Sequence, residues 1–182
     1  MTAPPEPQVI DFSPNDLAAL QALGRRLGKL VARGDVICLN GPLGAGKTTM
    51  TQAMAQGMGL PADQPVTSPT YGIIHEHWGK HQEEYRGAPR REHQGQLPLF
   101  HLDLYRLGGA EEELLELGIE DYLYGDGVCV IEWPDRLGQL KPAVRLEVEI
   151  EFSGPTGRRV SLRDHAAGWT ARLARESISQ GV

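Results

Sequence analysis

Gly41-Pro42-Leu43-Gly44-Ala45-Gly46-Lys47-Thr48 is the stretch that decides the fold of this chain. It fits the pattern G-x-x-x-x-G-K-[ST], in which backbone N–H groups of a glycine-rich loop converge on phosphate oxygens. The lysine adds a positive charge for the β- and γ-phosphates, and the hydroxyl that follows can bind Mg²⁺. We therefore expect a nucleotide-binding loop made of Gly44, Ala45, Gly46, Lys47, Thr48 and Thr49, with Thr48 as a metal ligand.

The residues on either side of this loop have the pattern that such a site requires. Before it, residues 36–40 form a short apolar run typical of a buried strand. After it, residues 47–58 contain good helix formers and no proline, and Gly57 and Gly59 mark the end. Met50, Met54 and Met58 recur every four residues in this predicted helix, which indicates a face packed in the core.

Length and composition indicate one globular domain spanning residues 1–182. The chain is 40% hydrophobic and 23% charged, which is ordinary for a soluble protein. It has no apolar run of membrane-spanning length and no signal-peptide pattern, so we expect a cytoplasmic protein without a membrane partner. Cys38 and Cys129 lie in apolar runs and are expected to be buried thiols. The net charge of −6 argues against direct wrapping of nucleic acid.

Two further segments contain candidate catalytic acids. Residues 99–106 alternate as a strand does, with His101, Asp103 and Tyr105 on one side. Residues 128–132 form an unbroken apolar run that ends in Glu132, as a buried parallel strand does when it brings a carboxylate to a phosphate pocket. Glu132 is therefore the candidate Mg²⁺-side acid. For Trp133, core packing is preferred over an adenine or partner contact.

The remaining segments complete the expected architecture. Residues 1–8 are proline-rich and expected to be loose. Ser13 and Pro14 predict the start of a helix that Gly34 ends. Residues 110–118 read as a short acidic helix with a solvated face, residues 144–152 and 158–162 as an antiparallel hairpin, and residues 169–178 as a closing helix. The predicted fold class is α/β: a P-loop NTPase-like domain of three layers with a mixed, largely parallel central sheet and a C-terminal antiparallel hairpin.

Two segments leave their interpretation open. Residues 66–71 form a hydroxyl-rich turn, which is either ordinary turn chemistry or a switch in which Ser68 and Thr70 sense Mg²⁺ or the γ-phosphate. Residues 75–98, after a predicted strand at 72–74, are interpreted as a surface insertion with some basic character. Its histidines are His75, His77, His81 and His93. Their spacing fits no usual zinc site, so a solvated loop is preferred over zinc.

Five motifs, taken in order, resemble the bacterial TsaE family, the ATPase of tRNA threonylcarbamoyladenosine biosynthesis. They are Gly44-Ala45-Gly46-Lys47-Thr48-Thr49, Ser68-Pro69-Thr70-Tyr71, His101-Leu102-Asp103-Leu104-Tyr105-Arg106, Leu117-Gly118-Ile119-Glu120-Asp121-Tyr122 and Ile131-Glu132-Trp133-Pro134. The resemblance covers about residues 10–165. It implies a subunit that binds and slowly hydrolyses ATP, so that the TsaD–TsaB complex can repeatedly modify the adenosine 3′ of the tRNA anticodon. The insertion is longer than the family pattern leads us to expect.

The resemblance also implies roles for particular residues. Residues 44–49 would hold the phosphates of ATP, with Lys47 as a catalytic residue, and Thr48 with Glu132 would hold Mg²⁺. Asp103 would lie near the attacking water or the metal. Leu17 would approach the adenine, and the turn at Gly157 and Arg158 would approach the nucleotide. TsaD and TsaB homologues would be the partners, with tRNA reached only through that complex.

Two other functions compete with this one. A small-metabolite kinase could use residues 75–98 as a phosphate lid, but it needs an acceptor pocket and a base that the sequence does not identify. A nucleotide-gated assembly factor would bind ATP without requiring hydrolysis. A GTPase is disfavoured because the chain has no N-K-x-D-type guanine motif.

Overall fold

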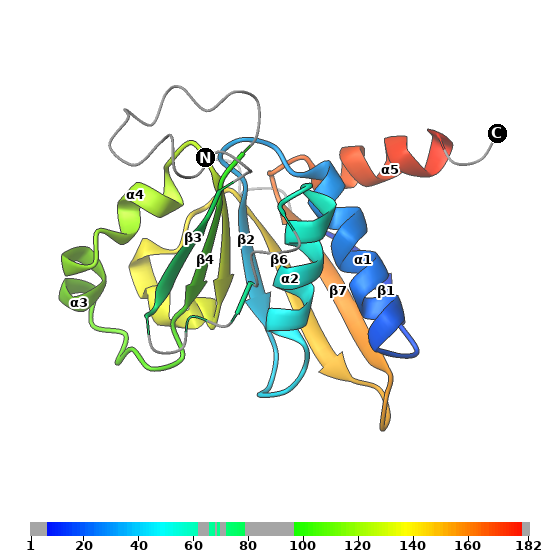
Figure 1. The fold of residues 1–182 in the computed structure, drawn as a ribbon, viewed down its shortest axis with the longest axis horizontal. Coiled ribbons are helices and arrows are strands. Elements are labelled where there is room, and N and C mark those ends of the chain that lie inside the picture. Colours follow the sequence, from blue (N-terminus) through cyan, green and yellow to red (C-terminus); the bar gives the residue numbers. More distant parts are fainter. Residues whose placement is uncertain (1–6, 62–65, 68, 70–71, 79–96, 180–182) are drawn as a thin grey trace.

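A computed structural model describes residues 7–61, 66–67, 69, 72–78 and 97–179 of the chain. Its strands are β1 (Gln8–Phe12), β2 (Val36–Asn40), β3 (Ile74–His77), β4 (Leu99–Asp103), β5 (Val128–Glu132), β6 (Arg145–Phe152) and β7 (Arg158–His165). Within the described ranges they form one sheet in the order β1-β7-β6-β2-β5-β4-β3 (Figure 1). Strands β4, β5, β2 and β6 are parallel neighbours, and the outer pairs are antiparallel. The predicted mixed sheet and C-terminal hairpin are confirmed.

Helices cover both faces of this sheet and make three layers, as predicted (Figure 1). The helices α1 (Leu17–Leu30), α2 (Lys47–Gly57) and α5 (Trp169–Ser179) contribute to the core on one face. The short helices α3 (Glu111–Glu116) and α4 (Ile119–Leu123) and the 3₁₀ segment η2 (Pro134–Leu140) contribute to the core on the other. Side chains of β2 alternate between these two cores, which gives the strand its unbroken apolar sequence. In the described segments, no helix combines the length and apolar character needed to cross a bilayer.

Glycines hold α1 and α2 in very close contact. A Cβ atom added to Gly28 would lie 2.1 Å from the carbonyl oxygen of Met54, and one added to Gly57 would lie 2.1 Å from that of Arg25. Atoms this close would overlap, so a larger residue at either position would force the helices apart. Because α2 begins at Lys47, this contact fixes the position of the helix that follows the predicted nucleotide-binding loop, residues 41–48, called the phosphate loop below.

Three element boundaries differ from the sequence predictions. Strand β1 begins at Gln8, inside the stretch expected to be loose, because its backbone pairs with the edge of β7. Strand β3 runs to His77, so the predicted insertion does not begin at His75, and residues 79–96 lie outside the described part. Helix α1 is capped by Asp16 rather than Ser13, since the Asp16 Oδ1 accepts a hydrogen bond of 2.8 Å from the Ala19 N–H.

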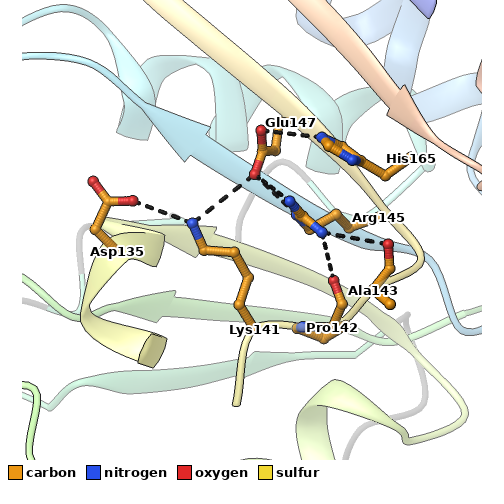
Figure 2. A network of polar contacts seen from close by, with 7 residues as sticks. All are labelled: Asp135, Lys141, Pro142, Ala143, Arg145, Glu147 and His165. Carbon is orange, nitrogen blue, oxygen red and sulfur yellow. Dashed lines mark hydrogen bonds and ion pairs between the residues drawn. The ribbon is translucent and has the colours of Figure 1, made fainter. Parts of the chain in front are cut away.

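A polar network surrounds Glu147 on β6 and reaches Asp135 in η2 (Figure 2). The carboxylate of Glu147 accepts hydrogen bonds from the Nε of Arg145 (2.9 Å) and the Nε2 of His165 (3.2 Å), and the Nζ of Lys141 lies 3.9 Å away. Burial alone would raise the pKa of the Glu147 carboxyl, but the bonds and charges of Arg145 and His165 leave that pKa below its ordinary value. Lys141 also bonds Asp135, so the network ties η2 to the hairpin.

Candidate nucleotide-binding site

The phosphate loop connects the end of β2 to the start of α2. Gly41 and Gly46 have φ angles of 138° and 113°, in the left-handed region that favours glycine. A Cβ on Gly41 would also lie 2.3 Å from the carbonyl oxygen of Ile150. No side chain of the described residues caps the N-terminus of α2. The loop and the first turn of α2 therefore present backbone N–H groups to an anion.

The side chain of Lys47 is folded over this loop. It is buried, and its Nζ donates hydrogen bonds to the carbonyl oxygens of Gly41 (2.7 Å) and Pro42 (2.9 Å). Burial lowers the pKa of Lys47, and the negative charges of Glu132 and Asp103 only partly oppose this effect. Phosphate oxygens would offer the ammonium group charged acceptors in place of the two carbonyls.

Two buried carboxylates lie beside the loop on adjacent parallel strands. Asp103 and Glu132 occupy paired positions at the ends of β4 and β5. The Oε1 of Glu132 accepts a hydrogen bond of 2.8 Å from the Thr48 hydroxyl, and the Nε2 of His101 lies 2.9 Å from the same oxygen. Mg²⁺ is usually bound by one or two carboxylates together with substrate phosphates and water. The Thr48–Glu132 pair fits that requirement.

Trp133 follows Glu132 and covers the loop from the other side. Its φ and ψ of 60° and 50° are left-handed, an unusual conformation for a residue with a side chain and one that costs about 1–3 kcal/mol. The centre of its ring lies 4.1 Å from the Nζ of Lys47 and 4.9 Å from the centre of the Tyr105 ring. Trp133 also packs against the second core cluster. The prediction that Trp133 packs in the core is therefore only part of its role, because its ring also lies against Lys47 and Tyr105.

These groups enclose a cavity of about 320 Å³. Its lining residues are Leu43, Gly44, Gly46, Lys47, Thr48, Thr49, Asp103, Tyr105, Glu132 and Trp133. The structure thus brings together three groups that are far apart in the sequence: the phosphate loop, Glu132, proposed with Thr48 to bind Mg²⁺, and Asp103, proposed to lie near the attacking water or the metal. Ala45, also a residue of the loop, is fully buried and does not line the cavity.

Of Leu17, expected near the adenine, and Gly157 and Arg158, expected near the nucleotide, only Arg158 has a described hydrogen bond to the loop. The Nε of Arg158 donates a hydrogen bond of 2.8 Å to the carbonyl oxygen of Ala45, and its backbone N–H donates to Pro14. Gly157 lies against the same segment before α1. Leu17, at the first position of α1, is 54% exposed. Neither Leu17 nor Gly157 lines the cavity, so their contact with a nucleotide stays a prediction.

Several predicted residues lie outside the described part of the chain. They are the switch residues Ser68 and Thr70 and the histidines His81 and His93. Within the described ranges, no three side chains of the histidine, cysteine, aspartate and glutamate types are arranged to hold a metal ion. Cys38 and Cys129 are buried and free, as predicted.

Sequence reasoning did not assign His101 and Tyr105 to the site, although it placed both on the Asp103 side of their strand. Tyr105 lies just beyond the end of β4 and lines the cavity. The side chain of His101 is fully buried and reaches the acid at the end of the neighbouring strand. The alternation of β4 together with a parallel β4–β5 pairing would have indicated this contact.

The sequence was also compared with known proteins. A family model described as "Threonylcarbamoyl adenosine biosynthesis protein TsaE" matches residues 14–160. The chain belongs to the TsaE family. The matched range includes every residue that lines the cavity.

Individual members of the TsaE family match over most of their length. A protein named tRNA threonylcarbamoyladenosine biosynthesis protein TsaE, from Bacillus subtilis (strain 168), is 35% identical over 141 residues, which are 78% of this chain and 77% of that protein. One of the same name from Synechocystis sp. is 37% identical over 135 residues, covering 72% and 74%. The crystal structure of Bacillus subtilis YdiB superposes with a TM-score of 0.72 at 27% identity and covers 96% of this chain and 98% of its own.

Proposed function

We propose that this chain binds ATP with Mg²⁺ and hydrolyses it slowly as a subunit of the tRNA threonylcarbamoyladenosine machinery. The observation that supports this most is the cavity where Lys47, Thr48 and Glu132 meet at the N-terminus of α2. Its position in a chain of the TsaE family connects the nucleotide chemistry with the pathway in the relatives' names. We place this activity in the cytoplasm, with homologues of TsaD and TsaB as partners.

Each residue of the site has a distinct task in this proposal. The loop N–H groups and Lys47 bind the phosphates, while Thr48 and Glu132 hold Mg²⁺. Mg²⁺ held by these two residues would supply positive charge that stabilises the phosphates during hydrolysis. Asp103 orients a water molecule whose oxygen bonds to the γ-phosphorus as the bond to ADP breaks, and the released proton leaves with phosphate.

The cavity also gives a reason for slow hydrolysis by the isolated chain. Among the described residues that line it, Lys47 is the only cation. P-loop enzymes that lack an arginine finger gain about 10³- to 10⁵-fold in rate when a partner supplies one. We therefore expect the partner complex to accelerate phosphate release. With a net charge of −6, this chain would meet tRNA through its partners.

Replacing Lys47 tests the proposed nucleotide site. Lys47→Ala should weaken ATP binding about 100-fold by removing the charge for the phosphates, while the melting temperature stays close to that of the wild type. Arg33→Ala is the matched control, because Arg33 is an exposed cation at the other end of β2. Calorimetric titration of ATP measures both variants. Unchanged ATP affinity in Lys47→Ala would contradict the phosphate-loop assignment.

Phosphate release, measured alone and with TsaB–TsaD homologues, tests the pathway role. Slow release that the partners accelerate is the expected result. Rapid phosphorylation of a small acceptor without partners would instead support the kinase. The assembly factor would be supported by a different result. In that case a variant that cannot hydrolyse ATP would still bind its partners in a nucleotide-dependent way and support full tRNA modification.

A further inference from the structure

His101 differs from a histidine that merely fills the core. It lies in the middle of β4, its side chain is fully buried, and its Nε2 lies 2.9 Å from the Oε1 of Glu132. The Thr48 hydroxyl donates to the same oxygen from the opposite element, the first turn of α2. One carboxylate oxygen is thus held between a helix and a strand.

The hydrogen bonds indicate which ring nitrogen of His101 carries the proton. An ionised Glu132 can only accept, so Nε2 is the donor in this contact. The Nδ1 atom is buried and has no partner among the described residues. If Nδ1 carries no proton, it is a buried acceptor without a donor. If it carries one, it is a buried N–H donor without an acceptor, and such donors are rarer in proteins than unused acceptors. In either case, the contact with Glu132 places a proton on Nε2.

A ring N–H that donates to a carboxylate oxygen fixes the direction of that side chain. The Nε2 of His101 and the Thr48 hydroxyl both contact the Oε1 of Glu132, so together they set the orientation of this carboxylate. Lys47, the nearby cation, donates its described hydrogen bonds to the loop carbonyls instead. In metal sites, groups behind the ligands commonly set ligand orientation in this way.

We propose that His101 is a positioning residue that holds the Glu132 carboxylate toward Thr48 for Mg²⁺-nucleotide binding. This inference rests on the proposed function. It predicts that loss of the His101 donor weakens nucleotide binding in the presence of Mg²⁺. Nucleotide binding without Mg²⁺, which depends on the phosphate loop, should stay unchanged.

Two substitutions separate positioning from simple packing. His101→Leu keeps an apolar side chain in the core but removes the donor. His101→Gln places an amide N–H at about the reach of Nε2 and should restore the contact. The control is His77→Leu, because His77 is a buried histidine on the same sheet face that has an unpartnered Nε2 within the described residues.

The experiment titrates Mg²⁺ into each variant with a non-hydrolysable ATP analogue, and measures analogue binding without Mg²⁺ in parallel. His101→Leu should raise the Mg²⁺ concentration for half-maximal binding at least about tenfold. Binding without Mg²⁺ should change less than about twofold, and His101→Gln and His77→Leu should stay near the wild type. Melting curves without nucleotide report whether each variant folds. If His101→Leu does not fold, His101→Asn replaces it, since its shorter amide cannot reach Glu132.

Three results would overturn the proposal. The first is that His101→Leu needs no more Mg²⁺ for half-maximal binding than the wild type. The second is that His101→Leu loses analogue binding equally with and without Mg²⁺. The third is that His101→Gln needs as much Mg²⁺ as His101→Leu. A wild-type chain that binds the analogue in neither condition would instead contradict the proposed function itself. In that case the positioning role of His101 would fall with it.

Discussion

Glu132 and Glu147 are two largely buried carboxylates on neighbouring parts of one sheet, and their surroundings are opposite. Glu132 accepts its described hydrogen bonds from the Thr48 hydroxyl and the Nε2 of His101. Glu147 is bonded by the guanidinium of Arg145 and by His165, with the Lys141 ammonium nearby.

We interpret this difference as one between a carboxylate proposed to bind Mg²⁺ and one expected to stabilise the fold. Cations around Glu147 compensate its charge, and the pKa of its carboxyl is lowered as a result. Lys47 acts on Glu132 through its charge and donates its described hydrogen bonds to the loop carbonyls. In our proposal this arrangement leaves the Glu132 carboxylate able to bind a metal ion beside the phosphate loop. The partners of the two acids thus distinguish them, whereas burial, which they largely share, does not.

Neutralising Glu132 should give the largest effect. Glu132→Gln removes the charge proposed to hold Mg²⁺ but keeps the size of the side chain, so hydrolysis should fall at least about 100-fold. Nucleotide binding without Mg²⁺ should persist, because the loop N–H groups and Lys47 are unchanged. Phosphate release and analogue binding are measured together. Hydrolysis at the wild-type rate would mean that Glu132 is structural and would remove the contrast with Glu147.

The same substitution at Glu147 should affect stability instead of activity. Glu147→Gln leaves Arg145 and His165 without their charged partner, so the free energy of unfolding should fall by about 2 kcal/mol. Hydrolysis per folded molecule should stay within about twofold of the wild type. Urea unfolding and phosphate release test this pair of expectations. Lost hydrolysis in a fully folded variant would contradict a purely stabilising role.

The pH dependence of stability should sharpen the comparison further. Because the folded-state pKa of Glu147 lies below its unfolded value, its ionisation stabilises the fold above the ordinary pKa of 4.5. That stabilisation should be lost as the pH falls from about 5 through the lower folded-state pKa. The stability difference between the wild type and Glu147→Gln should therefore narrow in acid. Urea midpoints at several pH values measure it, and a constant difference would rule out this titration.

Lys141 should give the smallest effect in the network. Its Nζ lies 3.1 Å from the Oδ1 of Asp135, whose side chain is 86% exposed, and 3.9 Å from Glu147. Ion pairs that face water contribute little, so Lys141→Ala should lower the free energy of unfolding by only about 0.5 kcal/mol. A loss as large as that of Glu147→Gln would show that the cations of this network act as one unit.

Local sequence was sufficient for the phosphate loop and for the strand that ends in Glu132. In both, the chemistry depends on residues a few positions apart, and apolar runs bounded by glycines specify the elements. The charge and hydroxyl pattern around Lys47 could therefore be assigned without knowledge of the rest of the fold.

Features that depend on distant pairing could not be predicted in the same way. Strand β1 exists because β7 offers it an edge more than 140 residues later in the sequence. The His101–Glu132 contact requires β4 to lie beside β5, which neither strand specifies alone. The left-handed backbone of Trp133 is imposed by the turn into η2 and has no sequence signal, because left-handed residues are usually glycine or asparagine.

The strand order has a consequence for the synthesis of this protein. Strand β2 and the phosphate loop are made early, but both strands that flank β2, namely β5 and β6, are made much later. Until β5 has been made, β2 has neither of its partner strands, and its second edge stays open until β6 follows. A nascent chain therefore leaves this apolar strand unpaired from residue 40 until β5 follows at residues 128–132, a stage at which unpaired edges favour aggregation or chaperone binding.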